Sequence, residues 1–278
     1  MLKQWITATI IALGLVAGAQ AQEAKRALTP IAGDVYRFQN NFHFNLVVVT
    51  NDGVVVTDPI NADAAAWLRA EIAKLTDKPI THLIYSHSHG DHASGGAAYG
   101  SVPNVIAHAN APAAIDGVTP TLRFDSELTF AHGGKTFELS YLGPGHGQDL
   151  IAMIVRPENV AFIVDAVSAK RLPYRDFPNA NVDDWTDQVR KAETLEFDIF
   201  APGHGGMGMK ADVTAGRVYM ERLRAAVLAE LKAGKSPAEI EQTVLMDEYK
   251  DWGSYKQWRA LNVRGMARFL AESGAVKK

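Results

Sequence analysis

The sequence predicts an α+β domain in which two β-rich halves pack sheet on sheet, with helices covering both outer faces. Three observations support this prediction. The first half alternates strand-like and helix-like segments, the strand pattern returns between Glu127 and Asp165, and helical segments close the chain. The 278 residues, 47% of them hydrophobic, can bury a full core. No repeat or linker interrupts Leu28–Gly274, so we expect one domain over residues 22–278.

Two valine-rich runs at Asn45–Thr57, separated by Asn51-Asp52-Gly53, predict a β-hairpin. Apolar residues at helical spacing then predict a helix over Asp63–Leu75. Thr81–Ser86 is a short apolar strand that stops at a histidine cluster, where a loop can present side chains. A further strand over Val102–His108 and a short helix over Ala109–Ile115 are expected.

The second half is predicted to contain strands at Lys135–Leu142, Leu150–Val155 and Val160–Val164, the last two joined by a polar turn. Helices are expected at Val182–Leu195, Ala211–Lys232 and Tyr255–Glu272. Near the C-terminus, Trp252, Tyr255 and Trp258 can pack the core, contact a second subunit or bind substrate. Aromatic residues at helical spacing favour core packing.

The first residues have the pattern of a secretory signal. Lys3 precedes the apolar run Ile6–Ala17, and Ala19-Gln20-Ala21 has the form of a cleavage site. The apolar run is shorter than the ~20 residues that a spanning helix needs. We therefore expect Met1–Ala21 to be removed, leaving a periplasmic or secreted protein with no membrane attachment.

Charge and cysteine content exclude several kinds of chemistry. Lys+Arg 28 against Asp+Glu 31 gives a net charge of −3, so no global field favours nucleic acid, and a small-molecule substrate is expected. Cysteine is absent, so a transition-metal site must use imidazole and carboxylate. With neither a thiol nor a GxSxG motif, covalent catalysis has no strong candidate.

The strongest local signal is Ser86-His87-Ser88-His89-Gly90-Asp91-His92, directly after a predicted strand. In a tight loop His87 and His89 can converge on one ion, while Asp91 and His92 can reach a second. A surface histidine cluster without metal is the alternative, but four ligands at this density make it the weaker interpretation.

Three later residues are candidate ligands in similar positions. His146 and His204 each follow a strand-like segment and are flanked by glycines, which allow tight turns and close approach of the backbone to an ion. Either alone is equally well explained as a turn residue. Asp165 ends an apolar strand, and its two oxygens can bridge two ions, although a carboxylate there can also form a turn.

Together with Thr57-Asp58 after the valine strand, this ordered set resembles the metallo-β-lactamase superfamily from about Gly33 to Gly206. The resemblance implies a four-layer αββα sandwich with two zinc ions at one edge. It implies that Asp58 orders the metal loop rather than binding metal. It also implies a first zinc on His87, His89 and His146, a second on Asp91, His92 and His204, and Asp165 as the bridge.

Within the superfamily, the glycine-rich segments around His146 and His204 are similar to those of the secreted zinc β-lactamases. This chain departs from them in having Asp165 for a cysteine and His92 for an arginine, as in glyoxalase II and the lactonases. Gly147 replaces a threonine. Ser168 replaces a lysine that binds the substrate carboxylate, a role that Lys170 or Arg171 can take.

The resemblance implies hydrolysis. Two zinc ions about 3.5–4 Å apart supply hydroxide near neutral pH, and Asp91 is the candidate catalytic residue. The segment Val167–Trp185 can form a substrate wall, with candidate contacts from Lys170, Arg171, Tyr174 and Phe177, or it can be an ordinary surface loop.

A β-lactam is the first substrate expectation and a lactone the alternative, with a thioester third. A non-enzymatic alternative is a periplasmic protein that binds metal without catalysing a reaction. The complete set of ligands argues against this alternative.

Overall fold

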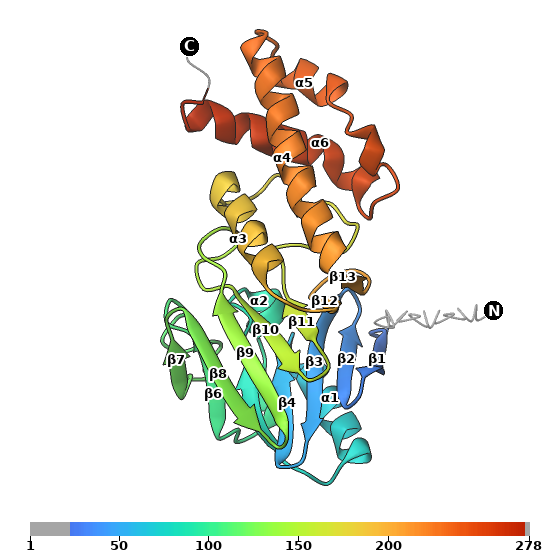
Figure 1. Ribbon diagram of the computed structural model, residues 1–278, viewed down its shortest axis with the longest axis vertical. Helices are drawn as coiled ribbons and strands as arrows, with labels where there is room; N and C mark the ends of the chain where they lie inside the picture. The colour runs from blue at the N-terminus through green and yellow to red at the C-terminus, as the bar shows by residue number, and fades with distance from the viewer. Residues whose placement is uncertain (1–22, 276–278) are drawn as a thin grey trace, which may run out of the picture.

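The computed structural model describes residues 23–275, and two β-sheets stacked face to face form its larger part (Figure 1). The predicted export signal at Met1–Ala21 lies outside the described residues. Helices pack on the outer face of each sheet, and the last three extend beyond one end of the sandwich (Figure 1). The predicted α+β sandwich with helices on both outer faces is confirmed.

The first sheet has seven strands in sequence order. Neighbouring strands are antiparallel from β1 to β4 and parallel from β4 to β7. The predicted hairpin is the β3–β4 pair. The strands are β1 Arg26–Ala32, β2 Val35–Asn40, β3 His43–Thr50, β4 Gly53–Thr57, β5 Ile80–Ile84, β6 Asn104–His108 and β7 Leu122–Phe124.

The second sheet has six strands in the order β13-β12-β11-β10-β9-β8. All its pairs are antiparallel except β11 with β12. The strands are β8 Glu127–His132, β9 Lys135–Tyr141, β10 Ile151–Arg156, β11 Val160–Ile163, β12 Ile199–Pro202 and β13 Gly208–Met209. Burial on both faces explains why β10 and β11 are continuous apolar runs rather than alternating ones.

Helix positions follow from capping as well as from apolar spacing. Asn61 caps α1 through a 2.9 Å bond from the Ala64 amide, and Asn181 caps α3. The three predicted long helices and the Asp63–Leu75 helix are confirmed within two residues of their expected ends. The helices are α1 Ala62–Leu75, α2 Gly90–Ala93, α3 Val182–Thr194, α4 Lys210–Lys232, α5 Pro237–Thr243 and α6 Tyr255–Glu272, with 3₁₀ turns η1 Gly96–Tyr99 and η2 Asp247–Tyr249.

Three apolar layers hold the sandwich together. Side chains such as Leu46 and Phe137 fill the space between the sheets, and α1 packs through Leu68 on the outer face of the first sheet. On the outer face of the second sheet, Ile163 belongs to a third layer that includes Trp185 of α3 and continues into α4 and α6. The C-terminal helices therefore share one core with the second sheet.

The predicted helix over Ala109–Ile115 is wrong. The segment forms turns and bends, because its carbonyl oxygens accept hydrogen bonds from a side chain instead of from the following turn of a helix. Arg123 donates to the carbonyls of Ala111 at 2.8 Å and Ala113 at 3.2 Å. Pro112 also removes a backbone donor.

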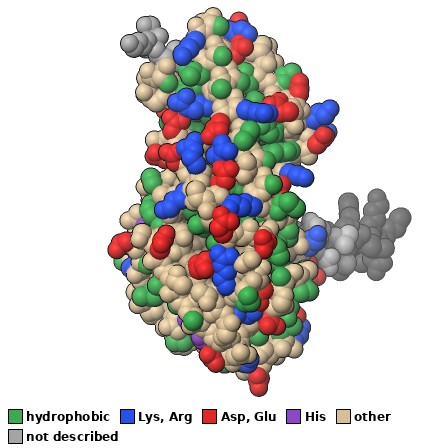
Figure 2. Space-filling model, in the orientation of Figure 1, with side chains coloured by type: hydrophobic (Ala, Val, Ile, Leu, Met, Phe, Trp, Pro, Cys, Tyr) green, Lys and Arg blue, Asp and Glu red, His purple; other side chains and the backbone are tan. Residues whose placement is uncertain are grey.

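On the face drawn in Figure 2, basic and acidic side chains are interspersed over the helical end. Arg217 of α4, for example, contacts Glu193 and Glu221. Among the helices of residues 23–275, none combines the length and apolar character needed to cross a membrane.

Candidate metal centre

The seven predicted ligands lie together at one edge of the sandwich, at the ends of strands from both sheets. The loop after β5 and the short α2 supply four of them, and the loops after β9, β11 and β12 supply one each. The donor atoms form two groups, each spanning no more than 4.8 Å. The first contains His87, His89, His146 and Asp165, and the second contains Asp91, His92, Asp165 and His204.

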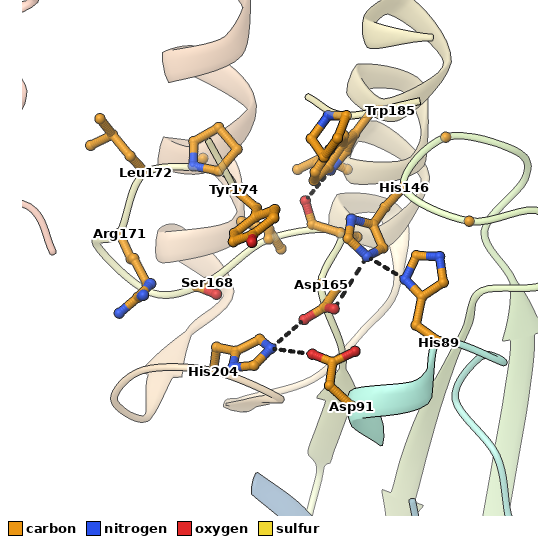
Figure 3. Close-up of a pocket in the computed structure, with 18 of the residues that line it drawn as sticks. His89, Asp91, His146, Asp165, Ser168, Arg171, Leu172, Tyr174, Trp185 and His204 are labelled. Carbon is orange, nitrogen blue, oxygen red and sulfur yellow. Dashed lines mark hydrogen bonds and ion pairs between the residues drawn. The ribbon is translucent and has the colours of Figure 1, made fainter. Parts of the chain in front are cut away.

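In the first group, Nδ1 of His89 lies 3.0 Å from Nε2 of His146. Asp165 Oδ2 lies 3.2 Å from that same His146 nitrogen and 3.7 Å from Nε2 of His87. Figure 3 shows His89, His146 and Asp165 pointing toward one another across the cavity.

In the second group, the Nε2 atoms of His92 and His204 are 3.1 Å apart. The Nε2 atom of His204 is 3.2 Å from Oδ1 of Asp165 and 3.7 Å from Oδ2 of Asp91. The Asp165 carboxylate thus lies between the two groups (Figure 3). Its Oδ1 faces His204, while the Oδ2 that faces His146 also lies 3.4 Å from Nε2 of His92.

These distances fit zinc. Ligand atoms held 2.0–2.1 Å from a tetrahedral ion are about 3.3 Å apart, close to the separations found here. The ring of His87 is fully buried, and its Nε2 has no hydrogen-bond partner among the described residues. A buried nitrogen without a partner is costly unless it binds something. Both groups of side chains therefore suit a divalent transition metal.

Neighbouring hydrogen bonds set the tautomers that such binding needs. The Ser86 hydroxyl donates to Asp58 Oδ2 at 2.6 Å, so it can only accept, at 3.0 Å, from Nδ1 of His87. The His87 proton is then on Nδ1, and Nε2 is free for a metal. In the same way, Nδ1 of His204 donates to the Phe42 carbonyl at 2.8 Å, which leaves its Nε2 free.

Asp58 itself is fully buried at the end of β4 and also accepts the Ser86 amide at 2.8 Å. Its Oδ2 lies 3.5 Å from Nδ1 of His92. The carboxylate therefore contacts one ligand directly and a second through Ser86, and it does not face the donor groups.

Burial and charge favour the ligand forms of His87 and Asp165. Burial holds the pKa of His87 well below its usual value, which keeps the imidazole neutral. Burial acts to raise the pKa of Asp165, but the nearby His92 and His146 outweigh it and hold the pKa well below the usual range. Neutral imidazole and ionised carboxylate are the forms that bind zinc.

Two glycines let the histidine loops reach the site. Gly145 has φ +156°, and a Cβ there would lie 2.5 Å from Oε1 of Gln188. At Gly203 a Cβ would lie 2.5 Å from Val164 and 2.9 Å from the His92 ring. Side chains at either position would displace a ligand loop.

Two buried polar side chains brace those loops. Gln188 of α3 accepts the His146 amide at 2.8 Å and donates to the Gly143 carbonyl at 2.6 Å and the Gly147 carbonyl at 3.2 Å. Arg37 of β2 reaches across from the first sheet and donates to the carbonyls of Pro202 and Gly205, each at 2.8 Å.

A cavity of about 950 Å³ opens from the metal centre. Of the four predicted substrate contacts, Arg171 and Tyr174 line it, on the side opposite His89 in Figure 3. Lys170 is exposed and outside the cavity lining. Phe177 is buried against the Trp185 ring, with the ring centroids 5.5 Å apart.

Several site residues were not predicted from the sequence. His43 begins β3, and its Nε2 lies 3.3 Å from Oδ2 of Asp91. Trp185 lines the cavity, with its ring centroid 4.7 Å from that of His146. The sequence around His43 gives no sign of a role in the site, because the residue that it contacts lies far away in the chain. The same holds for Gln188 and Arg37.

A sequence model of the metallo-beta-lactamase superfamily matches residues 41–204. The chain is 26% identical over 222 residues to the 2,4-dinitroanisole O-demethylase subunit alpha of Nocardioides sp. (strain JS1661), covering 76% of this chain and 67% of that protein. It is also 26% identical over 219 residues to the metallo-beta-lactamase type 2 of Elizabethkingia meningoseptica, covering 69% of this chain and 84% of the other.

Solved structures support the same fold. A metallo-beta-lactamase from Pontibacter korlensis aligns with a TM-score of 0.63 at 20% identity, covering 71% of this chain and 99% of its own. The metallo-beta-lactamase FIM-1 from Pseudomonas aeruginosa, in a mono-zinc form, aligns with a TM-score of 0.62 at 20% identity, covering 73% and 98%. The smaller coverage of this chain leaves more than a quarter of it without a counterpart in either structure.

Proposed function

Because the chain belongs to the metallo-β-lactamase superfamily, whose members are usually hydrolytic zinc enzymes, we propose that it is a dinuclear zinc hydrolase. Its substrate would be a small cyclic amide or ester, with a β-lactam as the first expectation and a lactone as the alternative. The observation that carries the proposal is the position of the Asp165 carboxylate, which lies between the two ligand groups and within 3.4 Å of imidazole nitrogens from both.

Two bound zinc ions would lower the pKa of a water molecule that they share and polarise the scissile carbonyl. His87, His89 and His146 would hold one ion and Asp91, His92 and His204 the other. The chain's own candidate for proton transfer is Asp91, which lines the cavity. Burial acts to raise its pKa, but hydrogen bonds from His204 and His43 outweigh this and hold the pKa well below the usual range. The lowered pKa keeps the carboxylate ionised, which is the form that binds a metal and makes proton transfer its secondary role.

Two features bear on the substrate. The relative from Elizabethkingia meningoseptica favours a β-lactam, whereas Asp165 and His92, in place of cysteine and arginine, favour a lactone. Arg171 is suited to an anionic group of either substrate. It lines the cavity, and no carboxylate of residues 23–275 forms an ion pair with it.

The test is a hydrolysis panel on zinc-loaded protein, with β-lactams, acyl-homoserine lactones, aliphatic lactones, thioesters and, because of the Nocardioides relative, an aryl methyl ether. We expect turnover of a β-lactam or a lactone that falls to background in Asp91→Ala. Turnover of thioester or ether alone would replace the proposed substrate class. Tight zinc binding without turnover of any compound would favour a metal-binding protein.

We also propose that the protein is exported, on the pattern of Met1–Ala21. Mass spectrometry of protein made in a Gram-negative host should give a mature N-terminus at Gln22 in the periplasmic fraction. An intact Met1 in the cytosolic fraction would contradict this.

A further inference from the structure

The cavity continues from the metal centre to the C-terminal helices. Four aromatic side chains form its far wall, and we call them the aromatic arm: Tyr174, which is exposed, Trp252 and Trp258, which are half-buried, and Tyr219, which is fully buried. In Figure 3 Tyr174 lies between Arg171 and Trp185, above Asp165 and His204. The same cavity thus joins the reacting centre to a surface rich in aromatic rings.

The rings of the arm are held in place by one another. Trp258 and Tyr174 meet edge to face with centroids 5.2 Å apart, and Trp252 lies 5.9 Å from Tyr219. The guanidinium of Arg171 lies over the Trp258 ring at 4.7 Å. Trp258 thus contacts both Tyr174 and Arg171, and Trp252 packs near Tyr219.

A buried polar residue fixes the arm to the rest of the cavity. Asn262 of α6 is fully buried, accepts the Tyr219 hydroxyl at 2.7 Å and donates to the Pro173 carbonyl at 3.0 Å. It also donates to the carbonyl of Arg175. Because one side chain joins α4, α6 and the segment that carries Tyr174, the arm is a built surface and not a chance gap between helices.

Most of the arm lies beyond the region that the family model matches. That match ends at residue 204, ahead of α4, which leaves Tyr219, Trp252 and Trp258 outside it. They face the same cavity as the ligands, which indicates a role in choosing the substrate rather than in the reaction itself.

We propose that the aromatic arm binds an aromatic group that the substrate carries beyond its scissile ring. Aromatic walls attract such a group through both burial and edge-to-face contacts. The inference rests on the proposed hydrolase function for its kinetic consequence, but the binding of an aromatic ring can be measured separately.

The kinetic test uses substrate pairs that share a scissile ring: benzylpenicillin with 6-aminopenicillanic acid, and N-phenylacetyl- with N-acetyl-homoserine lactone. In the zinc-loaded wild type, the ring-bearing member should have at least about tenfold higher kcat/KM, mainly through a lower KM. Trp258→Ala should remove most of that difference, and Trp258→Phe should retain it. Phe269→Ala is the matched control, since Phe269 packs in the helical core outside the cavity lining. Equal kcat/KM within both pairs would overturn the proposal.

The binding test uses 2-naphthaleneacetamide, a neutral probe, with acetamide as its control, measured by calorimetry on the same zinc-loaded proteins. We expect only the naphthyl compound to bind, with at least about tenfold weaker binding in Trp258→Ala and unchanged binding in Phe269→Ala. If the naphthyl compound binds in a way that depends on Trp258 but no substrate pair is turned over, the proposal of aromatic binding stands and the proposed hydrolase function is refuted. Turnover without ring preference or ring binding would reject the arm alone. Thermal melts of each variant check the fold.

Discussion

Gln188 offers a direct test of how the fold supports the first ligand group. It is fully buried in α3, and its amide makes three hydrogen bonds to the loop that carries His146. Gln188→Met keeps the length of the side chain but leaves one N–H and two carbonyls without partners. Each unsatisfied group costs about 1–3 kcal/mol of folding free energy. The total loss of stability is about 3 kcal/mol if the loop relaxes so that the three groups reach water in the cavity, and more if it does not. Loss of such bracing lowers metal affinity about 10–100-fold.

Urea unfolding of the metal-free protein measures the change in the free energy of unfolding, and competition with a chromophoric chelator measures zinc affinity. The weakened zinc should be the one bound by His146, while Gln257→Met, an exposed glutamine of α6, should leave both quantities unchanged. Gln188→Glu retains the acceptor for the His146 amide but loses both donors, so its effect should lie close to that of Gln188→Met. Wild-type zinc affinity and stability in Gln188→Met would refute the bracing argument.

Four further predictions follow from other positions. Asp91→Ala should reduce kcat at least about 100-fold with little loss of fold, and near-normal steady-state turnover would contradict its assigned role. Asp165→Ala should weaken both zinc ions together, since its oxygens face both ligand groups; metal analysis showing two tight zinc ions would remove the bridge. Gly203→Ala should cost about 1–3 kcal/mol of stability by overpacking and weaken the zinc that His92 and His204 bind, as seen by denaturation and zinc competition. Burial, with His132 nearby, lowers the pKa of His82 from 6.5 to about 4, so the folded state loses stability as pH falls from 6.5 toward 4. His82→Phe should therefore lessen the drop in Tm over that pH range. Parallel curves of Tm against pH for the variant and the wild type would contradict this.

The sequence predicted the sandwich because burial patterns are local. The valine runs of β3 and β4 and the apolar runs of β10 and β11 each report their own environment. The helix expected over Ala109–Ile115 failed for the opposite reason, because Arg123 captures its carbonyls from another segment. A long-range side-chain contact of this kind produces no pattern in the sequence of the segment whose conformation it changes.

The difference between local patterns and long-range contacts also explains which site residues could be predicted from the sequence. The candidate ligands could be named from the sequence because metal binding demands particular residue types at close spacing, as in His87-Ser88-His89-Gly90-Asp91-His92, and the structure brings them together. His43, Gln188 and Arg37 were missed because each acts across the fold on a loop more than 40 residues away. Trp252 and Trp258 were expected to pack the core. They do pack against it, and they also face the cavity.

Asn262 links α4 to the Pro173–Arg175 segment, and it is one of several polar contacts, with Arg224–Asp183 and Arg268–Asp176, that join the C-terminal helices to the zinc-binding half. If the aromatic arm binds substrate as proposed, changes within α4 and α6 should alter which molecules bind in the cavity, while every candidate metal ligand lies in the preceding part of the chain. Libraries restricted to the cavity-facing positions of those helices would therefore search substrate range with the catalytic groups held constant. Variants at Asn262 should loosen the link between Tyr219 and the Pro173–Arg175 segment, and the expected result is a broader substrate range with weaker binding of each substrate.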